Sequence, residues 1–208
     1  MFYRLSPRLA LRSRWRPHRP RPGERVLVLR TGYVFPPSHP TTRVCLDLLK
    51  ELLEAGTLRP RDRLLDVGCG SGVLLLAAAA AGGGRGVGVD LSHRAVLVSR
   101  DNALRNGLAA AVHLVQGSTE CLRGPFAVNV ANLPFAVQLA KVAELSRLAG
   151  PAGCLILSGF KDSQESELLA RYREAGWTLK RRLTREEWAI ELPPDRSFTW
   201  VGWLLKPA

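Results

Sequence analysis

The 208-residue sequence predicts a doubly wound α/β fold, in which a mostly parallel, seven-stranded sheet carries helices on both faces. From residue 63 onward, five short apolar segments alternate with four segments of helical length and pattern, and each connection is short. Such alternation is typical of parallel βαβ units. Two further strand-like segments close the chain and are expected to pair antiparallel at one edge, which brings the sheet to seven strands.

The individual elements follow from apolar periodicity and from helix-start and turn signals. A short strand is expected over 25–29, and Thr41 or Thr42 is expected to cap a helix that ends at Gly56. Strands are then expected near 63–67, 86–90, 112–116, 126–131, 153–158, 178–190 and 198–205. Helices are expected near 72–81, 93–106, 135–148 and 162–175.

The formal net charge of +12 is concentrated near the start of the chain, where residues 1–22 contain seven arginines and no acidic residue. We interpret these residues as a basic, Pro/Arg-rich, flexible tail, and residues 23–208 as one folded domain. The arginines suit contact with RNA phosphates, but a disordered solubilising arm has the same composition. A mitochondrial transit peptide is a third interpretation, which Pro17, Pro20 and Pro22 disfavour because they interrupt an amphipathic helix.

Apolar runs and cysteine spacing indicate in which cellular compartment the protein is expected. The longest apolar run, from Val73 to Ala81, is far shorter than the roughly 20 residues that span a bilayer, so no membrane segment is expected. The four cysteines are scattered without CxxC spacing. We therefore expect reduced thiols in a cytoplasmic protein, and no metal site.

A glycine-rich turn follows the strand expected at 63–67. Asp66 stands near the end of this strand, and Gly68, Gly70 and Gly72 follow at alternate positions ahead of a helix. Glycines here permit positive φ and a close approach of the backbone to a ligand across the strand ends. The spacing differs from the GxGxxG of dinucleotide-binding loops, because residue 73 is valine. Asp66 would also repel a phosphate, whereas it can accept a hydrogen bond from an amino group.

A second acid lies at the end of the next expected strand. Asp90 stands 24 positions after Asp66, and a carboxylate there can accept both hydroxyls of a ribose. With the glycine turn, the two acids predict that the chain binds S-adenosyl-L-methionine (SAM), whose methionine moiety carries an amino group, rather than NAD or FAD. Ser118, which follows the strand expected near 112–116, is a further candidate cofactor contact.

Further motifs lie outside the glycine turn. They are Ser38-His39-Pro40-Thr41-Thr42-Arg43, Arg100-Asp101-Asn102-Ala103-Leu104-Arg105-Asn106-Gly107, Val130-Ala131-Asn132-Leu133, Leu157-Ser158-Gly159 with Ser163-Gln164, and Arg185-Glu186-Glu187-Trp188. With these motifs the sequence resembles the PrmA family, whose members trimethylate amino groups of ribosomal protein L11, from about residue 26 nearly to the C-terminus. The resemblance implies a Rossmann-like class I SAM-dependent methyltransferase with a protein substrate, ribosomal in type, and a cytoplasmic location.

The resemblance also implies roles for individual residues. Thr42, Gly68, Asp90 and Asn132 occupy the positions at which the family contacts SAM. Two departures from the family pattern are visible. A glycine-rich stretch of the family is replaced by Phe-Pro-Pro-Ser at residues 35–38, which predicts a stiffer loop. The resemblance covers a catalytic domain only, without a counterpart of the family's N-terminal substrate-recognition domain.

The segment Asn132-Leu133-Pro134-Phe135 is the candidate catalytic motif. It partly matches the Asn-Pro-Pro-aromatic motif of enzymes that methylate planar amides or exocyclic amines, with leucine in place of the first proline. Asn132 would orient the accepting nitrogen, while Phe135 and Trp188 would desolvate it, which favours the neutral amine. The alternative role of Phe135 is a core position at a helix start, and His39 suits either a general base or a structural role in its loop.

Three functions stay open from the sequence. The shared motifs favour a SAM-dependent N-methyltransferase that acts on a protein. The arginines of residues 1–22 and the Asn-Leu-Pro-Phe segment also fit an RNA or small-molecule methyltransferase. An inactive SAM-binding scaffold is the third interpretation, because the recognition domain of the family has no counterpart in the matched region.

Overall fold

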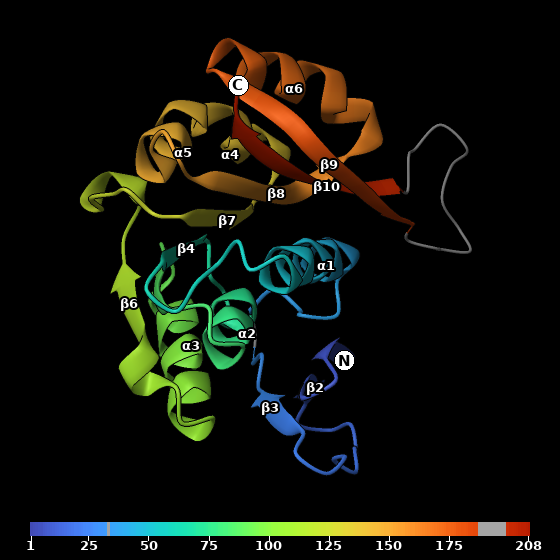
Figure 1. The fold of residues 1–208 in the computed structure, drawn as a ribbon. Coiled ribbons are helices and arrows are strands. Elements are labelled where there is room, and N and C mark those ends of the chain that lie inside the picture. Colours follow the sequence, from blue (N-terminus) through green and yellow to red (C-terminus); the bar gives the residue numbers. More distant parts are fainter. Residues whose placement is uncertain (33, 187–198) are drawn as a thin grey trace.

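The computed structural model describes residues 1–32, 34–186 and 199–208, and it contains a seven-stranded sheet in the order β6-β5-β4-β7-β8-β10-β9 (Figure 1). Neighbouring strands from β6 to β8 pair in parallel, and β10 pairs antiparallel with both β8 and β9. This arrangement confirms the predicted sheet. Its strands are β4 (Arg63–Val67), β5 (Arg85–Asp90), β6 (Val112–Gln116), β7 (Val128–Asn132), β8 (Cys154–Lys161), β9 (Trp177–Glu186) and β10 (Thr199–Pro207).

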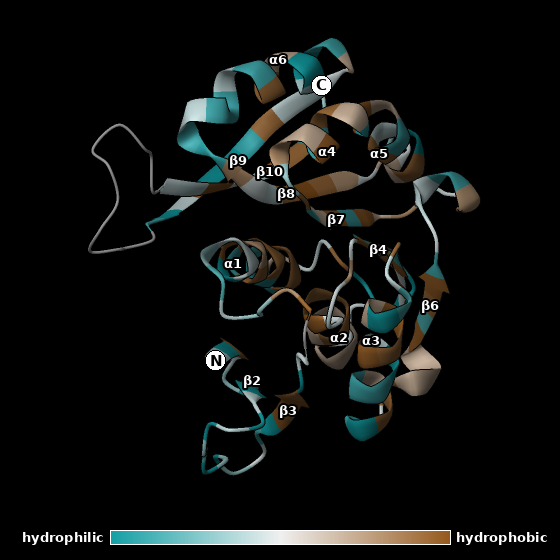
Figure 2. Cartoon of the chain, turned by 180° about the vertical axis from the view of Figure 1, so that it is seen from behind, coloured by the Kyte–Doolittle hydropathy of each residue, from teal (hydrophilic) through white to brown (hydrophobic). Residues whose placement is uncertain are grey.

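Helices cover both faces of this sheet (Figure 1). One layer holds α1 (Pro40–Glu54), α2 (Val73–Ala80) and α3 (His93–Arg105), and the other holds α4 (Phe135–Ala140), α5 (Val142–Ala149) and α6 (Glu165–Glu174). Short 3-10 turns are η1 (Ala109–Ala111), η2 (Thr119–Cys121) and η3 (Asp162–Gln164). Each layer packs its own buried cluster against the sheet, with Leu46 and Leu75 in the first cluster and Phe160, Tyr172 and Trp203 in the second. In Figure 2 the central strands β7 and β8 are accordingly mostly brown.

Two helix predictions need correction. The helix expected over 135–148 is divided at Lys141 into α4 and α5, because the φ of −108° at this residue departs from helical geometry. The first helix begins at Pro40, and its N-cap is His39 rather than Thr41 or Thr42. The strand expected over 178–190 is described as far as Glu186, and its remaining residues lie outside the described part of the chain.

Residues 1–22, which we expected to form a flexible tail, contain two strands. β1 (Phe2–Ser6) pairs antiparallel with β2 (Leu9–Ser13), and β2 pairs in parallel with β3 (Arg25–Leu29). Alternate side chains are the reason, since Tyr3, Leu5, Leu9 and Leu11 are buried in the same cluster as helix α1. The neighbouring Arg4 and Arg12 are half-buried and point to the other side of the small sheet. The expected boundary at residue 22 therefore falls inside this sheet.

Polar contacts fix the small sheet to helices α1 and α3. The Tyr3 hydroxyl donates to Asp47 Oδ1 of α1 at 2.7 Å. Asn102 of α3 and its C-cap residue Asn106 bond to the backbone of β3 and its extension. Asn106 joins both backbone polar groups of Val28, and Asn102 joins both of Arg30. Each amide thereby pairs both backbone polar groups of one residue at the outer edge of β3 and its extension.

Among the described residues, no helix combines the length and hydropathy needed to cross a bilayer. In the same residues there is no group of three or more histidine, cysteine or carboxylate side chains placed to hold a metal ion. All four cysteines are free thiols, and only Cys121 is exposed.

Candidate active site

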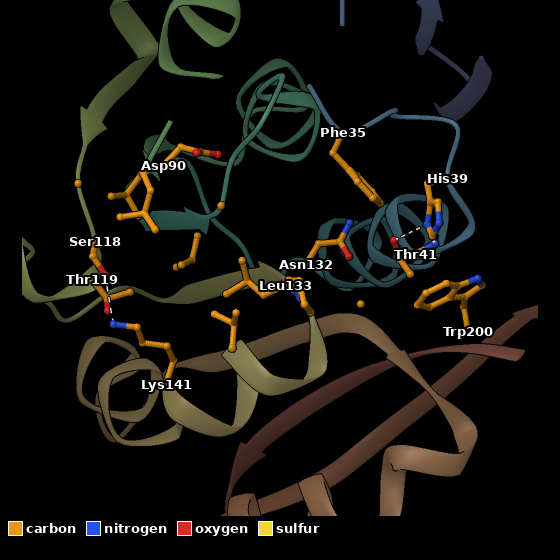
Figure 3. A pocket seen from close by; sticks show the side chains of 18 residues that line it. Phe35, His39, Thr41, Asp90, Ser118, Thr119, Asn132, Leu133, Lys141 and Trp200 are labelled. Atoms are coloured by element: carbon orange, nitrogen blue, oxygen red, sulfur yellow. Dashed lines mark hydrogen bonds between the residues drawn. The ribbon is translucent and has the colours of Figure 1, made fainter. Parts of the chain in front are cut away.

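A cavity of about 470 Å³ lies at the carboxyl ends of β4, β5, β6 and β7 (Figure 3). The strand order reverses direction at β4, whose neighbours are β5 on one side and β7 on the other, and such switch points are where ligands bind in open α/β sheets. The volume falls within the usual range for small-molecule sites. The lining residues are Phe35, His39, Thr41, Val67, Gly68, Val89, Asp90, Leu91, Gly117, Ser118, Thr119, Asn132, Leu133, Pro134, Val137, Lys141, Gly159 and Trp200.

The three predicted glycines have different positions around the cavity. Gly68 lines it with φ of +70°, and a Cβ at this residue would lie 2.5 Å from Leu133 Cδ2. Gly70 donates its N–H to the Asp90 carboxylate at 2.9 Å. Gly72 is the N-cap of α2 and packs against Ser99, away from the cavity surface. Gly68 thus lines the main cavity and Gly70 lines a smaller pocket beside it, while Gly72 shapes the turn behind both.

Asp66 lines a smaller pocket of about 50 Å³ that shares Phe35, Gly68 and Asn132 with the main cavity. Its side chain is 1% exposed, and Oδ2 accepts a hydrogen bond from the Leu75 backbone N–H at 3.2 Å. Burial raises the pKa of this carboxyl to about 7. A positively charged group in the pocket would favour the ionised form, so Asp66 is suited to an ammonium ligand and unsuited to a phosphate.

Asp90 ends β5 at the opposite side of the Gly68 turn. Its two carboxylate oxygens accept from the backbone N–H groups of Gly70 and Ser92, each at 2.9 Å. An ionised carboxylate has about four acceptor positions, so capacity is left for two hydroxyl groups of a ligand. The backbone bonds fix the orientation in which Asp90 offers that capacity to the cavity.

Asn132 is the polar side chain between the two pockets. Its Nδ2 donates to Thr42 Oγ1 at 3.3 Å, which brings together two residues predicted as cofactor contacts. The segment around Asn132 is fixed from behind by Gln138, whose side-chain amide donates to the carbonyls of Ala131 and Ser158 at 2.8 and 2.9 Å. Asn132 therefore stands on a rigid strand end, which is the arrangement required of a positioning group.

The aromatic side chains at the cavity differ from those predicted. Phe135 is half-buried against the second core cluster and does not line the cavity. Phe35 and Trp200 do line it, and both pack against His39 with ring centroids 4.7 and 4.9 Å apart (Figure 3). Trp188, the second aromatic residue predicted here, lies outside the described residues.

His39 uses its Nδ1 atom to cap helix α1. This nitrogen accepts from the Thr41 backbone N–H at 3.3 Å and lies 2.9 Å from Thr41 Oγ1. Of the two roles that the sequence leaves open, these contacts support the structural one. Thr41 faces the main cavity and Thr42 the smaller pocket, so the first turn of α1 contributes to both.

Ser118 lines the end of the cavity near Asp90, as Figure 3 shows. Its hydroxyl accepts a hydrogen bond from Lys141 Nζ at 3.1 Å, and the same ammonium pairs with Glu120. Lys141 was not predicted as a site residue, and neither were Phe35 and Trp200. The break between α4 and α5 places Lys141 here, and the sequence offers no separate signal for that break.

Comparison with known proteins places the chain in a family. The family model described as ribosomal protein L11 methyltransferase (PrmA) matches residues 3–192. Two curated relatives with that name, from Geobacter metallireducens and Syntrophotalea carbinolica, are 36% and 38% identical to this chain. The alignments cover 91% and 89% of this chain and 61% and 60% of the relatives. The chain thus spans about three fifths of the length of these relatives.

Solved structures show the same fold. A ribosomal protein L11 methylase from Lactobacillus delbrueckii subsp. bulgaricus superposes with a TM-score of 0.79 over 99% of this chain and 98% of that chain, at 22% identity. A SAM-dependent methyltransferase from Geobacter sulfurreducens, in complex with S-adenosyl-L-homocysteine, superposes with a TM-score of 0.61 over 78% of this chain and 91% of that chain, at 19% identity.

Proposed function

The chain belongs to the ribosomal protein L11 methyltransferase (PrmA) family, and we propose that it binds SAM and methylates amino groups of a ribosomal protein of the L11 type. The observation that carries this proposal is the placement of Asp66, Asn132 and Asp90 around the Gly68 turn, in two pockets that share their lining. The Asp66 carboxylate is buried where a cation fits, and the Asp90 carboxylate lies where hydroxyl groups fit.

Each part of SAM has a candidate partner among the described residues. Asp66, in the smaller pocket, would accept from the amino group of the methionine moiety, and Asp90 from the ribose hydroxyls. Val89 and Leu91 give the cavity an apolar wall beside Asp90, where a planar base can be buried. Ser118 adds a polar group at that end. Gly68 allows the ligand to cross the strand ends in contact with the backbone.

Bound SAM supplies an electrophilic methyl group on a sulfonium centre. The chain's own contribution is to position the acceptor and to remove water from around it. Asn132 would orient a neutral amine through its side-chain amide without serving as a base. Phe35, Leu133 and Trp200 surround that position with apolar surface, which disfavours the ammonium form of the acceptor. Lowering an amine pKa from about 10.4 to about 7 requires roughly 4 to 5 kcal/mol from such surroundings.

The proposal is tested with radiolabelled SAM and two acceptors, purified ribosomal protein L11 and a cell extract. We expect label on L11, and protease-sensitive label in the extract. Asn132→Ala is expected to lower kcat/KM for the protein acceptor by about 100-fold, because a poorly placed acceptor reacts that much more slowly. Phe135→Leu, which changes an aromatic side chain outside the cavity lining, should act at close to the wild-type rate.

Other results would redirect the assignment. Label that nuclease removes and protease does not would indicate an RNA methyltransferase. SAM binding without any label on protein or RNA would leave a small-molecule enzyme or an inactive scaffold. We place the activity in the cytoplasm, where a ribosomal protein substrate is available and where the four free cysteines stay reduced.

A further inference from the structure

The small N-terminal sheet carries an exposed tryptophan among arginines, and we propose that this surface binds single-stranded RNA. Trp15, in the segment between β2 and β3, is 83% exposed. A large apolar side chain exposed to this extent marks a candidate contact surface when polar residues surround it. We call it the Trp15 surface, and it consists of Trp15 and the exposed side chains of Arg8, Arg14, Arg16, Arg19 and Arg21. The proposal is independent of the methyl transfer described above.

The tryptophan is presented by an ordered segment. Arg12 Nη1 donates to the carbonyls of Ser13, Arg14 and Arg16 at 3.3, 3.1 and 3.1 Å. The backbone N–H of Arg14 donates to Leu29 of β3, and that of Arg16 donates to Ser13. The half-buried Arg12 thus holds the turn around Trp15 in one shape. A surface ordered in advance loses less conformational entropy when a ligand binds.

Negative charge within this part of the chain is neutralised. Glu24 is the only acidic residue among residues 1–46. Its side chain is inaccessible to solvent and pairs with Arg4 at 3.0 Å and His18 at 2.8 Å. The Arg21 backbone N–H, with these two partners, lowers the pKa of Glu24 to about 2. Glu24 therefore organises the segment internally and does not oppose the approach of a polyanion.

The arginines extend along the sheet as well as around Trp15. Strands β2 and β3 are parallel, so the segment from Arg14 to Glu24 must return from the end of β2 to the start of β3. It therefore spans the length of a five-residue strand. That length corresponds to roughly 17 Å. Phosphates of an extended strand can be contacted along this length, while the indole ring offers a face on which a base stacks. The Arg14 guanidinium, 4.8 Å from the ring centre, shows that a planar cation already uses one face.

An RNA strand fits this surface better than an anionic membrane does. Within residues 1–32, Trp15 is the only large apolar side chain that is exposed. Membrane-surface segments bury an apolar face made of several such residues, whereas a stacking platform needs one aromatic ring beside cations. Single-stranded RNA is recognised by this combination of ring stacking and phosphate contacts.

Fluorescence anisotropy with a short labelled single-stranded RNA of mixed sequence tests the proposal on the full chain. Trp15→Ala should weaken binding about 5-fold or more without changing its salt dependence, because a stacked base is lost and the charge is kept. Arg14→Ala/Arg16→Ala should lower the slope of log K against log salt by about 0.7 for each phosphate contact removed. The matched control is Arg171→Ala/Arg173→Ala, which removes the same charge from α6 at the far end of the molecule (Figure 1).

Calorimetry with SAM shows whether each variant keeps its fold, since the Trp15 surface lies outside the cavity lining. The proposal is overturned if the wild-type chain does not bind the RNA, or if Trp15→Ala binds it as tightly as the wild type. Equal weakening by the two double variants would also overturn it, because net charge alone would then explain the affinity. Binding to vesicles of anionic phospholipid without binding to RNA would assign the surface to membranes instead.

Discussion

Asp66 is a buried carboxylate beside a ligand pocket, so its protonation is linked to folding as well as to binding. Burial raises its pKa from 3.8 to about 7, and the charge of Asp90 acts in the same direction. At a pH between 3.8 and about 7, Asp66 is protonated in the folded protein and ionised in the unfolded chain. This group therefore destabilises the ligand-free protein increasingly as pH rises through that window, by up to about 4 kcal/mol.

SAM affinity should have the opposite dependence on pH. The ionised form of Asp66 attracts the ligand's amino group, so affinity is expected to rise as pH increases through about 7. Asp66→Asn should bind SAM more weakly at about pH 8 and lose this rise, while its ligand-free form is more stable than the wild type there. Calorimetry of both proteins between about pH 6 and about pH 8.5 measures the ratio of their Kd values. A ratio independent of pH would contradict the linkage.

Gly68 is required for its conformation and for the space that it leaves. Gly68→Ala places a methyl group 2.5 Å from Leu133 Cδ2 and forces alanine to adopt φ of +70°. We expect a stability loss above the roughly 1 kcal/mol of the left-handed conformation alone, together with a marked fall in SAM affinity. Gly176→Ala is the matched control, because its φ is +81° and nothing lies within 4 Å of the added Cβ. If both variants bind SAM equally well, the Gly68 turn does not contact the ligand.

Site residues of the strand ends were predictable because the fold repeats a local pattern. An acid or amide that directly follows an apolar strand must emerge at the carboxyl edge of the sheet, which is where Asp90 and Asn132 lie. Phe135 shows the limit of this reasoning. A helix start has an inner and an outer side, and one residue of offset decides which side chain reaches the cavity. Trp200 comes from the last strand, and its position depends on long-range pairing that a local pattern does not contain.

At the scale of elements, α3 is connected to both the small sheet and the glycine turn through Asn102. This side chain is fully buried and donates to the carbonyls of Arg30 and Ser71 at 2.7 and 2.9 Å, and it accepts from the Arg30 N–H at 2.9 Å. Ser71 belongs to the turn that begins at Gly68. The contact therefore couples the segment leading to Phe35 with the turn that lines the cavity.

Asn102→Ala is expected to lower the free energy of unfolding by about 2 kcal/mol, because a fully buried side chain loses three hydrogen bonds to the backbone, one of them to the buried Ser71 carbonyl. SAM affinity should fall as well, since the glycine turn loses a support. Asn106→Ala removes a comparable pair of bonds to Val28 from a half-buried site, where water can replace them, so its effect should be smaller. Urea denaturation measures both variants, and similar losses would show that the buried contact with Ser71 contributes nothing.

Strands β1 and β2 are the elements least visible in the sequence, because arginines accompany their apolar residues. In β1 the buried positions alternate, which is the period of a strand, and in β2 Leu9, Ala10 and Leu11 are all buried. The arginines of residues 1–22 nevertheless suggest a disordered tail by composition. The strand period was present in Tyr3, Leu5, Leu9 and Leu11, and the turn signal in Pro7. In this segment the spacing of the apolar residues, and not the arginine content, predicts the observed strands.

For the molecule as a whole, the sheet was predictable because its strands alternate regularly with helices, and right-handed parallel crossovers leave few topologies for such a chain. The packing of the small sheet against α1 and α3 was not, since it joins residues far apart in sequence. The described chain is thus a large sheet with two helical layers, to which a three-stranded sheet is fixed by a shared apolar cluster.

Deletion of residues 1–22 separates the two interpretations of this segment. A flexible arm could be removed without effect on stability. In the structure, deletion removes four large buried side chains, those of Tyr3, Leu5, Leu9 and Leu11, and exposes the surface of α1 and β3 that they cover. At about 1.5 to 3 kcal/mol for each buried side chain, the loss matches the whole stability of a typical domain, so we expect the shortened chain to unfold or aggregate.

Thermal melting and size-exclusion chromatography measure the stability and the association state of the shortened chain directly. The arginine-to-alanine variant at positions 14 and 16 retains the four apolar side chains and should melt close to the wild type, whereas a deleted chain that melts like the full one would show that the sheet does not support the fold.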